Sequence, residues 1–279
     1  MQGKILEKKL LEMLREDVGF SDITTAFTPK RKVRAEIIAK DEGIVSGISE
    51  LGQLFRSFNI EAACRLRDGG RVKKKQAIYS LEGDSRDILI VERTALNILS
   101  RMSGISTLTR KYVDAASLGD PRVRIAATRK TTPCFAYFEK KAVAAGGGDT
   151  HRLSLQDEVL IKDNHLRLFG SVAEALKAAK KETSFTHKIE IEVSTAKDAI
   201  IAAENGADIV MLDNMPAAEI KRTVKQMEAK GVREKVLIEA SGGINLENVA
   251  EYARTGVDVI SIGRLTHSAP ALDVSLEIL

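Results

Sequence analysis

The sequence predicts an α/β protein built from a small mixed α+β region followed by a parallel α/β barrel. From about residue 122, strand-like apolar runs alternate six times with helical segments. Before that point, long helical periods stand beside short strands bounded by glycine. Successive strand-then-helix units imply parallel strands with right-handed crossovers, and their tight spacing favours a closed barrel over a large open sheet.

The first part of the chain is expected to hold three main helices and several short strands. Apolar residues recur every three or four positions in the long helical segment, as Ile88, Val91 and Leu99 illustrate. The predicted helices cover residues 4–15, 50–58 and 87–117, and the predicted strands cover residues 33–39, 44–47 and 77–81.

The second part repeats one pattern, in which each strand leads into a helix. Ser171 with Glu174, and Thr195 with Asp198, have the spacing of capping boxes at helix starts. Gly206, Gly231 and Gly256 stand where helices end. The six predicted strands cover residues 123–128, 158–163, 188–193, 208–214, 235–243 and 257–263.

Composition argues against several classes of partner. The chain has 279 residues with 43 basic and 39 acidic side chains, and a net charge of +4 is too small to indicate nucleic-acid or membrane binding. No apolar stretch approaches the length of a membrane span, and the charged N-terminus lacks a signal-peptide core. Cys64 and Cys134 form no CxxC pattern, so neither a metal knuckle nor a disulfide framework is indicated. We expect a cytoplasmic protein.

Polar residues cluster at the carboxyl end of nearly every predicted barrel strand. In parallel barrels this is the face on which active sites are built. A single such residue, for example Asp213 or Ser241, is more often a helix cap, but six coincident polar ends weigh against that interpretation. The ends are Thr128-Arg129-Lys130, Lys162-Asp163-Asn164-His165, Glu190 with Glu192, Asp213-Asn214, Ser241-Gly242-Gly243 and Gly263-Arg264.

Basic side chains would converge at the mouth of this barrel. Such charges repel one another, and removing them from water without a partner costs free energy, so they need anionic groups nearby. Arginine suits bidentate contacts with carboxylate or phosphate, and lysine a point contact. A substrate with several negative charges is the natural complement of Arg129, Lys130, His151, Arg152 and Lys162.

Two glycine-containing loops point to a phosphate. Ser241-Gly242-Gly243 precedes a helix expected to begin near Asn245, where backbone N–H groups can cradle an anion. The loop after the last strand, which begins at Gly263, lies next to it. The last two loops of a barrel commonly form a phosphate site, so the adjacent pair indicates more than either loop alone.

Glu192 and Asp213 lie on neighbouring strands and leave two interpretations open. They could hold Mg²⁺ through water or face a cationic transition state. Alternatively, they could form ordinary ion pairs with Lys162 or Lys130. Glu190 alternates with Glu192 and should face the same side of its strand, so at least one of the two lies inside the barrel.

The chain resembles the quinolinate phosphoribosyltransferases, decarboxylating glycosyltransferases of de novo NAD synthesis, over essentially its whole length. Each motif alone is modest, but their order and spacing are highly specific. Besides LREDVG and DITT near the start and NILSRMSGI before the barrel, they are TRKTTP, EKKAV, GGG, HR, LIKDNH, IEIEV, MLDN, EASGGI and GVDVISIGRLTHS.

The resemblance implies an N-terminal α/β sandwich over residues 1–108, completed by residues 266–279, and an incomplete α/β barrel over residues 109–265. It also implies a homodimer in which Arg101 reaches the partner's site, with Mg²⁺ as cofactor. Possible higher assembly stays open.

By the same resemblance, Arg129, His151, Arg152 and Lys162 hold the two carboxylates of quinolinate. Lys130 reaches phosphoribosyl diphosphate, and Glu192 and Asp213 lie by the ribose and Mg²⁺. Lys130, Lys162, Glu192 and Asp213 are thus the expected catalytic group. The 5′-phosphate is expected among Ser241, Gly242, Gly243, Gly263 and His267.

Several positions depart from the family pattern, and none removes a charged ligand. Cys134 stands where glycine is usual, Ser154 and Ser21 each replace a frequent glycine, and Asp149-Thr150 precedes His151 where asparagine is common. Three rivals remain: a nicotinate phosphoribosyltransferase, a paralogue associated with molybdenum transport, and a non-catalytic phosphoribosyl-ligand binding protein. The two arginines argue against the first, the intact LIKDNH against the second, and the complete catalytic group against the third.

Overall fold

The computed structural model describes residues 3–279, which divide into two compact units. The first unit contains the chain up to Arg110, together with Thr132–Gly147 and Ser268–Leu279, and the second contains Lys111–Thr131 and Gly148–His267. The stretch 132–147, expected from sequence within the barrel domain, therefore has its main contacts in the first unit. None of the helices in residues 3–279 combines the length and the apolar character that a membrane crossing requires.

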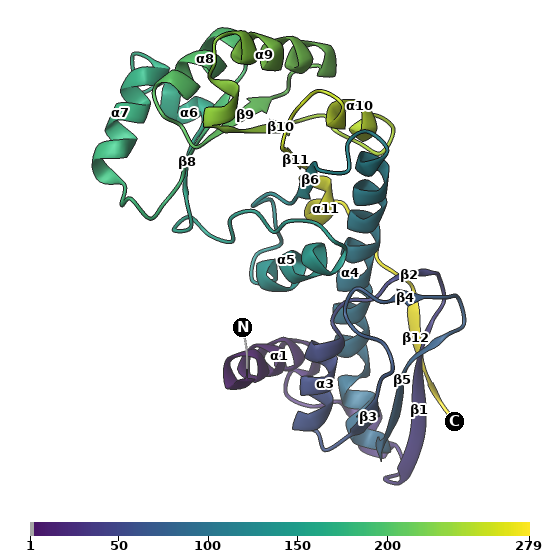
Figure 1. Ribbon diagram of the computed structural model, residues 1–279. Helices are drawn as coiled ribbons and strands as arrows, with labels where there is room; N and C mark the ends of the chain where they lie inside the picture. The colour runs from purple at the N-terminus through teal and green to yellow at the C-terminus, as the bar shows by residue number, and fades with distance from the viewer. Residues whose placement is uncertain (1–2) are drawn as a thin grey trace. The chain divides into compact units, whose positions relative to one another are not determined.

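The first unit is built on a four-stranded antiparallel sheet with strand order β12-β1-β5-β3 (Figure 1). The C-terminal strand β12 pairs with β1 from Ala35 opposite Ile278 to Ala39 opposite Val274, so the end of the chain completes the sheet begun near its start. The four strands are β1 (Lys32–Ala39), β3 (Glu61–Ala63), β5 (Ala77–Asp84) and β12 (Val274–Ile278). A short antiparallel pair, β2 (Gly43–Ile44) with β4 (Arg71–Val72), accompanies them.

The helices of the first unit bury the apolar stripes that the sequence predicts. Leu6, Leu10 and Leu14 are buried along one face of α1, at the spacing of a helical stripe. The long helix α4 contributes many core residues, among them Ile88 and Leu99, and its last turns belong to the second unit. The helices are α1 (Gly3–Val18), α2 (Ile23–Phe27), α3 (Ile48–Ser57), α4 (Ser85–Ser117) and α5 (Ala136–Ala145).

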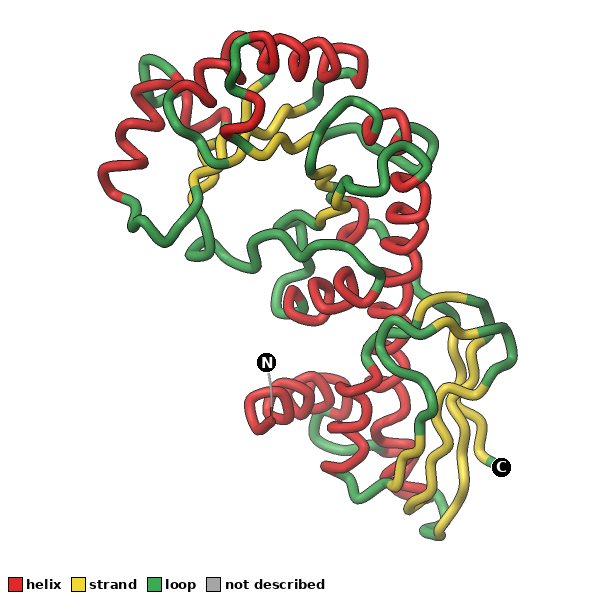
Figure 2. Tube along the Cα trace, viewed as in Figure 1, coloured by secondary structure: helices red, strands yellow, loops and turns green. Residues whose placement is uncertain are grey.

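The second unit contains one six-stranded parallel sheet with order β6-β11-β10-β9-β8-β7. Figure 2 colours its strands yellow, the helices red and the connecting loops green. From β7 to β11, strands that follow one another in the chain are neighbours in the sheet, and β6 joins the sheet beside β11. Parallel neighbours need crossover connections, which the intervening helices supply. The strands are β6 (Arg124–Ala126), β7 (Val159–Ile161), β8 (Ile189–Val193), β9 (Ile209–Asp213), β10 (Leu237–Ser241) and β11 (Val259–Ser261).

The expectation of a closed barrel is wrong, because β6 and β7 are the two ends of the strand order and do not pair with each other. The outer edge of β6 is instead occupied by an isolated parallel bridge between Ala126 and Asp149. Asp149 donates its N–H to Ile125 O at 2.7 Å, and Ala127 donates to Asp149 O at 2.9 Å. The loop before His151 therefore replaces a strand at this edge, and the incomplete barrel implied by the family resemblance is the correct description.

Helices follow the strands, and the predicted caps at Ser171 and Thr195 are confirmed, whereas the helix expected near Asn245 begins at Val249. Ser171 Oγ accepts the N–H of Glu174 at 3.2 Å, and Thr195 Oγ1 accepts that of Asp198 at 3.1 Å. Glycines 206, 231 and 256 have φ of 74°, 68° and 95° beyond the helix ends, a conformation that glycine adopts without strain. The segments are α6 (Asp163–Leu166), α7 (Val172–Glu182), α8 (Ala196–Glu204), α9 (Ala217–Ala229), η1 (Arg233–Lys235), α10 (Val249–Ala253) and α11 (Arg264–His267).

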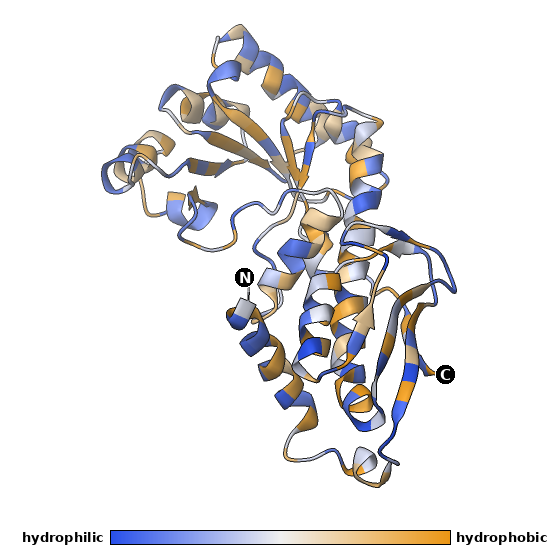
Figure 3. Cartoon of the chain, turned by 60° about the horizontal axis from the view of Figure 1, so that its bottom comes forward, coloured by the Kyte–Doolittle hydropathy of each residue, from blue (hydrophilic) through white to orange (hydrophobic). Residues whose placement is uncertain are grey.

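The two faces of the parallel sheet differ in polarity because side chains alternate along each strand. On β8, the apolar residues Ile189, Ile191 and Val193 are buried in one set, while Glu190 and Glu192 form the other. Figure 3 shows strongly apolar colouring along these strands, interrupted by polar positions. The interior of the open barrel therefore carries carboxylates, whereas the opposite face of β8 is apolar.

Glu190 is fully buried, and neither of its carboxylate oxygens has a hydrogen-bond partner among the described residues. Burial, then the nearby Glu239, then a contact with Glu158, raise the pKa of Glu190 to about 10. A carboxyl group that stays protonated in the folded state and ionises in the unfolded state makes folding less favourable as pH rises.

We therefore expect Glu190→Gln to stabilise the protein most at alkaline pH. Between the ordinary pKa of 4.5 and the raised value of Glu190, the native state binds one proton more than the unfolded state, so wild-type stability falls with rising pH. The neutral amide removes this loss. Urea unfolding at about pH 6 and about pH 9 measures it, and the gain in unfolding free energy should be larger at the higher pH. The exposed Glu204→Gln is the control; an equal gain at both pH values would contradict the interpretation.

Candidate active site

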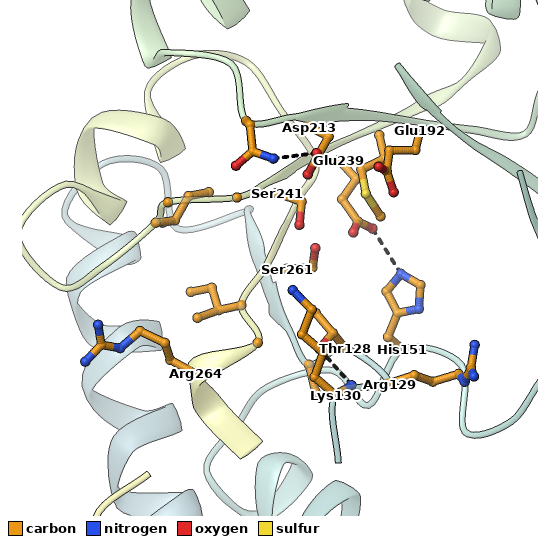
Figure 4. A pocket seen from close by; sticks show the side chains of 18 of the residues that line it. Thr128, Arg129, Lys130, His151, Glu192, Asp213, Glu239, Ser241, Ser261 and Arg264 are labelled. Carbon is orange, nitrogen blue, oxygen red and sulfur yellow. Dashed lines mark hydrogen bonds and ion pairs between the residues drawn. The ribbon is translucent and has the colours of Figure 1, made fainter. Parts of the chain in front are cut away.

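A pocket of about 630 Å³ opens at the carboxyl ends of the parallel strands, within the second unit. It collects residues from the strand ends and from the loops that follow them. Figure 4 shows Glu192, Asp213 and Glu239 projecting from the strands toward the pocket, with Lys130 facing them. Its lining includes Thr128, Arg129, Lys130, His151, Arg152, Lys162, Glu192, Asp213, Asn214, Glu239, Ser241, Gly242, Gly243, Asn245, Ser261, Gly263, Arg264 and His267.

The loop after β6 holds Arg129 and Lys130 in place through its backbone. Lys130 donates its N–H to Thr128 Oγ1 at 3.2 Å, and the carbonyl of Lys130 accepts the hydroxyl of Thr266 at 2.7 Å. These bonds fix the main chain from which the two basic side chains project. The loop after β11 thus supports the loop after β6.

Arg152 and Arg129 are close enough to repel each other. Burial first, and then the charge of Arg129, lower the pKa of Arg152 from its usual value. The carboxylates that act in the opposite direction are Glu158, Glu190 and Asp157, and Arg152 Nη1 also reaches the carbonyl of Glu158 at 3.5 Å. A partly buried guanidinium group beside an exposed one in the same pocket is complementary to a ligand with more than one carboxylate.

His151 lies at the pocket wall in a left-handed backbone conformation, with φ of 53°. Its N–H donates to Asp149 Oδ1 at 2.8 Å, which supports this conformation. Its ring nitrogen Nδ1 accepts the N–H of Arg152 at 2.8 Å, and its Nε2 lies 3.1 Å from Glu239 Oε2. The ring is therefore held between the backbone of its neighbour and a buried carboxylate.

Glu192 and Asp213 are the acidic pair at the pocket rim. Burial first, and then Asp213, raise the pKa of Glu192, while Lys162 and Lys130 act to lower it. Lys162 Nζ stands 3.9 Å from Glu192 Oε2, a loose pair, and Asn214 Nδ2 donates to Asp213 Oδ2 at 2.5 Å. Two neighbouring carboxylates whose charges repel each other form a donor set suited to a hydrated divalent cation.

The sequence left open which of Glu190 and Glu192 faces the site, and their different depths in the barrel distinguish them. Both alternate on the same side of β8, opposite Ile209 and Met211 of β9. Glu192 lines the pocket and keeps 16% of its side chain exposed, whereas Glu190 is fully buried and does not line it. Glu192 is thus the carboxylate that a ligand can reach.

The glycine loop after β10 packs closely against Asn214 because Gly242 lacks a side chain. Gly242 has φ of 90°, and a Cβ there would lie 2.2 Å from Asn214 Oδ1. Gly243 has φ of 65°, and a Cβ added to it would meet no heavy atom within 4 Å, so its site is open. A Cβ on Gly263 would approach both Lys130 and His267 at 3.1 Å. The backbone of these loops is therefore free to face a phosphate group.

Every site residue predicted from sequence lines this pocket except Arg101. Arg101 lies in the first unit, where its Nη2 is 2.7 Å from Glu139 Oε1 and its Nη1 donates to Ala269 O at 3.1 Å. Cys134 is exposed, has φ of 64° and does not line the pocket. That left-handed conformation is one glycine adopts without strain, which fits the glycine usual at this position in the resembling family.

Sequence reasoning missed Glu239 and Ser261, which also line the pocket. The signal for Glu239 was present, because it precedes Ser241 by two residues and so shares its side of β10. In the same way Ser261 pairs with Ser241 in register. Alternation predicts which side a residue faces, but not that it reaches the pocket.

Together these residues combine a cationic wall (Arg129, Arg152 and Lys162), the acidic pair Glu192 and Asp213, and a glycine-rich backbone in one pocket. Such an arrangement can bind a polycarboxylate beside a phosphorylated sugar and stabilise positive charge at a sugar carbon. The ring nitrogens of His151 contact Arg152 and Glu239 rather than a serine or cysteine nucleophile. The chemistry that the pocket supports is therefore positioning and charge stabilisation.

Comparison with known proteins gives family matches along most of the chain. Residues 22–103 match the family "Quinolinate phosphoribosyl transferase, N-terminal domain", and residues 105–277 match "Quinolinate phosphoribosyl transferase, C-terminal domain". A probable carboxylating nicotinate-nucleotide pyrophosphorylase of Methanothermobacter thermautotrophicus is 48% identical over 269 residues, covering 96% of each chain.

More distant relatives cover the chain equally well. The carboxylating nicotinate-nucleotide pyrophosphorylase of Rattus norvegicus is 36% identical over 95% of this chain and 88% of its own. The solved nicotinate-nucleotide pyrophosphorylase from Francisella tularensis aligns with a TM-score of 0.92 at 34% identity, over 100% of this chain and 98% of its own. With both family domains matched in order over nearly its full length, the chain belongs to the quinolinate phosphoribosyl transferase family.

Proposed function

We propose that this protein transfers the phosphoribosyl group of phosphoribosyl diphosphate to quinolinate, with release of CO₂ and diphosphate, to form nicotinate mononucleotide for NAD synthesis. The observation that carries the proposal is the pairing of two arginines with a glycine phosphate loop in one pocket. Membership of the quinolinate phosphoribosyl transferase family supports it. The decisive assay supplies quinolinate, phosphoribosyl diphosphate and Mg²⁺ and measures CO₂ release.

The cationic wall would hold the acceptor. Arg129 and Arg152 can each contact a carboxylate through two N–H groups, and Lys162 supplies a point charge. These three cations, of which Arg152 is partly buried, favour a dicarboxylate over a monocarboxylate, because a dicarboxylate can pair with more than one of them. This preference separates the proposed reaction from that of a nicotinate phosphoribosyltransferase, whose acceptor has one carboxylate.

The opposite side of the pocket would hold the donor. The backbone of Gly242 and Gly243, with Gly263 and His267 nearby, suits the 5′-phosphate, and Lys130 can reach the diphosphate. Glu192 and Asp213 fit a hydrated Mg²⁺ because both are carboxylates on neighbouring strands near the rim. When bound, Mg²⁺ would neutralise charge on the diphosphate.

The reaction needs positioning more than covalent catalysis. The bond between ribose C1 and the diphosphate oxygen breaks, the pyridine nitrogen bonds to C1, and Glu192 and Asp213 favour the positive charge that develops on the ribose. Loss of the 2-carboxylate as CO₂ then leaves an electron pair beside the pyridinium nitrogen, and this carbon takes up a proton. No enzyme nucleophile is required, and exposed Cys134 lies outside the pocket lining.

Assembly and location extend the proposal. A homodimer would bring the partner's copy of Arg101, a residue of the first unit, to the pocket of the second unit. The pairing of Arg101 with buried Glu139 would hold its guanidinium in a fixed direction for that role. A cytoplasmic enzyme of NAD synthesis fits the two free cysteines.

Removal of either arginine of the wall should weaken quinolinate binding selectively. In Arg129→Ala and Arg152→Ala, the KM for quinolinate should rise roughly 10- to 100-fold, the scale of a lost charged hydrogen bond, with little change in the KM for phosphoribosyl diphosphate. Arg122→Ala, whose side chain is 88% exposed and lies outside the pocket, is the matched control. A rise confined to the donor KM would contradict the assignment of the wall.

A shared site predicts complementation between two inactive chains. In a dimer of Arg101→Ala with Lys162→Ala, one of the two sites receives Lys162 from one chain and Arg101 from the other. Random mixing should restore up to about a quarter of wild-type activity, because half the dimers are mixed and each has one intact site. Each variant refolded alone provides the baseline, and a mixture no more active than the two baselines would rule out the shared site.

Loss of one rim carboxylate should weaken the response to Mg²⁺. Asp213→Asn removes one of the two proposed water-mediated ligands, so the Mg²⁺ concentration for half-maximal rate should rise several-fold, on the order of fivefold, since one charged interaction is lost. Initial rates across a Mg²⁺ series measure this shift. Asp41→Asn, an exposed change in the first unit, is the control. An unchanged Mg²⁺ dependence would argue against Asp213 as a ligand.

A further inference from the structure

The wall of the pocket contains a contact that the proposed mechanism does not use. Glu239 stands on β10 with only 1% of its surface exposed, and its Oε2 lies 3.1 Å from Nε2 of His151. Its other oxygen, Oε1, is buried and has no hydrogen-bond partner among the described residues. A carboxylate placed so deep needs a reason, because burial without a partner is costly.

The hydrogen bonds of His151 determine which ring nitrogen carries its hydrogen. The N–H of Arg152 lies 2.8 Å from Nδ1, and an amide N–H can only donate, so Nδ1 accepts. The hydrogen of the neutral ring is then on Nε2, where it donates to Glu239 Oε2. Glu158 Oε1, 3.4 Å from Nδ1, is the more distant contact and does not displace this assignment.

The same contacts occupy both ring nitrogens of the imidazole. Nδ1 is used by the backbone of Arg152 and Nε2 by Glu239, with Glu190 Oε2 a further 3.6 Å neighbour of Nε2. His151 therefore acts on a bound substrate through Arg152. It accepts the backbone N–H of Arg152, and the guanidinium of Arg152 belongs to the cationic wall.

We propose that Glu239 is a positioning residue for substrate binding, which orients His151 through Nε2 and thereby fixes the backbone that aims Arg152 into the pocket. The chain of contacts runs from a rigid strand to a loop. Glu239 is paired in register with Met211 of β9 and Val259 of β11, so its backbone is held from both sides. His151, by contrast, lies in a loop with φ of 53°, a conformation that needs support.

The identity of the substrate in this inference rests on the proposed function. The contact between Glu239 and His151 does not depend on it. The tautomer of His151 and its dependence on Glu239 can be measured without any turnover. The effect on quinolinate can be measured only if the reaction is the proposed one. The two kinds of failure are therefore distinguishable.

The first experiment reads the ring directly. The chain has four histidines, so two-bond ¹H–¹⁵N spectra of ¹⁵N-histidine-labelled protein can be assigned by the signals lost in His151→Asn. We expect His151 to be the Nε2–H tautomer in wild type and to remain so in Glu239→Gln, whose amide oxygen still accepts. In Glu239→Leu it should become a tautomer mixture, because the ring is then no longer held against the Arg152 N–H that makes Nδ1 the acceptor. A wild-type Nδ1–H tautomer, or a ring indifferent to Glu239→Leu, would overturn the proposal.

The second experiment separates positioning from general damage to the fold. Glu239→Leu should raise the quinolinate KM about tenfold or more, as for loss of an orienting bond to a binding group, with the donor KM changed less than about twofold. Glu239→Gln should recover most of that loss. Thr223→Val removes a buried hydroxyl of α9 that has no partner among the described residues and should leave both KM values unchanged.

The kinetic outcomes decide the matter in either direction. If Glu239→Leu lowers kcat with both KM values unchanged, Glu239 does not act through substrate binding and the proposal fails. If Glu239→Gln fails to rescue although thermal unfolding shows both variants folded, the charge of Glu239 matters rather than its acceptor, and the proposal also fails. If wild type ignores quinolinate while the tautomer results hold, the proposed function fails and the contact between Glu239 and His151 stands.

Discussion

The parallel register of six strands is the constraint on which the site depends. Each strand is locked to its neighbours by backbone hydrogen bonds, so residues far apart in sequence come to the same level. Ser241 pairs with both Asp213 and Ser261, and Glu239 with Met211. Because alternate residues face one side, a single register gathers acidic and hydroxyl side chains at one carboxyl edge, where loops add the basic ones.

The strand register places two electrostatic environments close together, one at the pocket rim and one deeper in the barrel. At the rim, Glu192 and Asp213 remain accessible and suit a cation or a developing positive charge. One level deeper, burial and the neighbouring carboxylates keep Glu190 protonated, its pKa raised to about 10. The loop cations belong to the accessible layer, where an anionic ligand can compensate them. The deep layer instead contacts the imidazole of His151, and through it the loop that carries Arg152.

Left-handed backbone conformations occur at several positions of the pocket loops, as they do elsewhere in the chain. His151, Gly242 and Gly243 all take left-handed conformations, and each is supported or permitted by its surroundings. Asp149 holds the backbone of His151, while the absence of a side chain allows Gly242 to lie against Asn214. Asp149 also covers the edge of β6, so one residue both ends the sheet and places the start of the binding loop. The open form of the barrel is thus tied to the construction of the site.

The sequence by itself determined the elements and the chemistry of their ends. Helical and strand periods are local, and polar strand ends can be read from neighbouring residues, so the pocket from Arg129 to His267 was predictable. Tertiary structure decided what depends on distant contacts. At the outer edge of β6, the bridge to Asp149 takes the place of a further strand, and the barrel is open there. The greater burial of Glu190 distinguished it from Glu192, and strand register brought Glu239 to His151. These outcomes follow from hydrogen bonds between segments far apart in the chain, about which local periodicity carries no information.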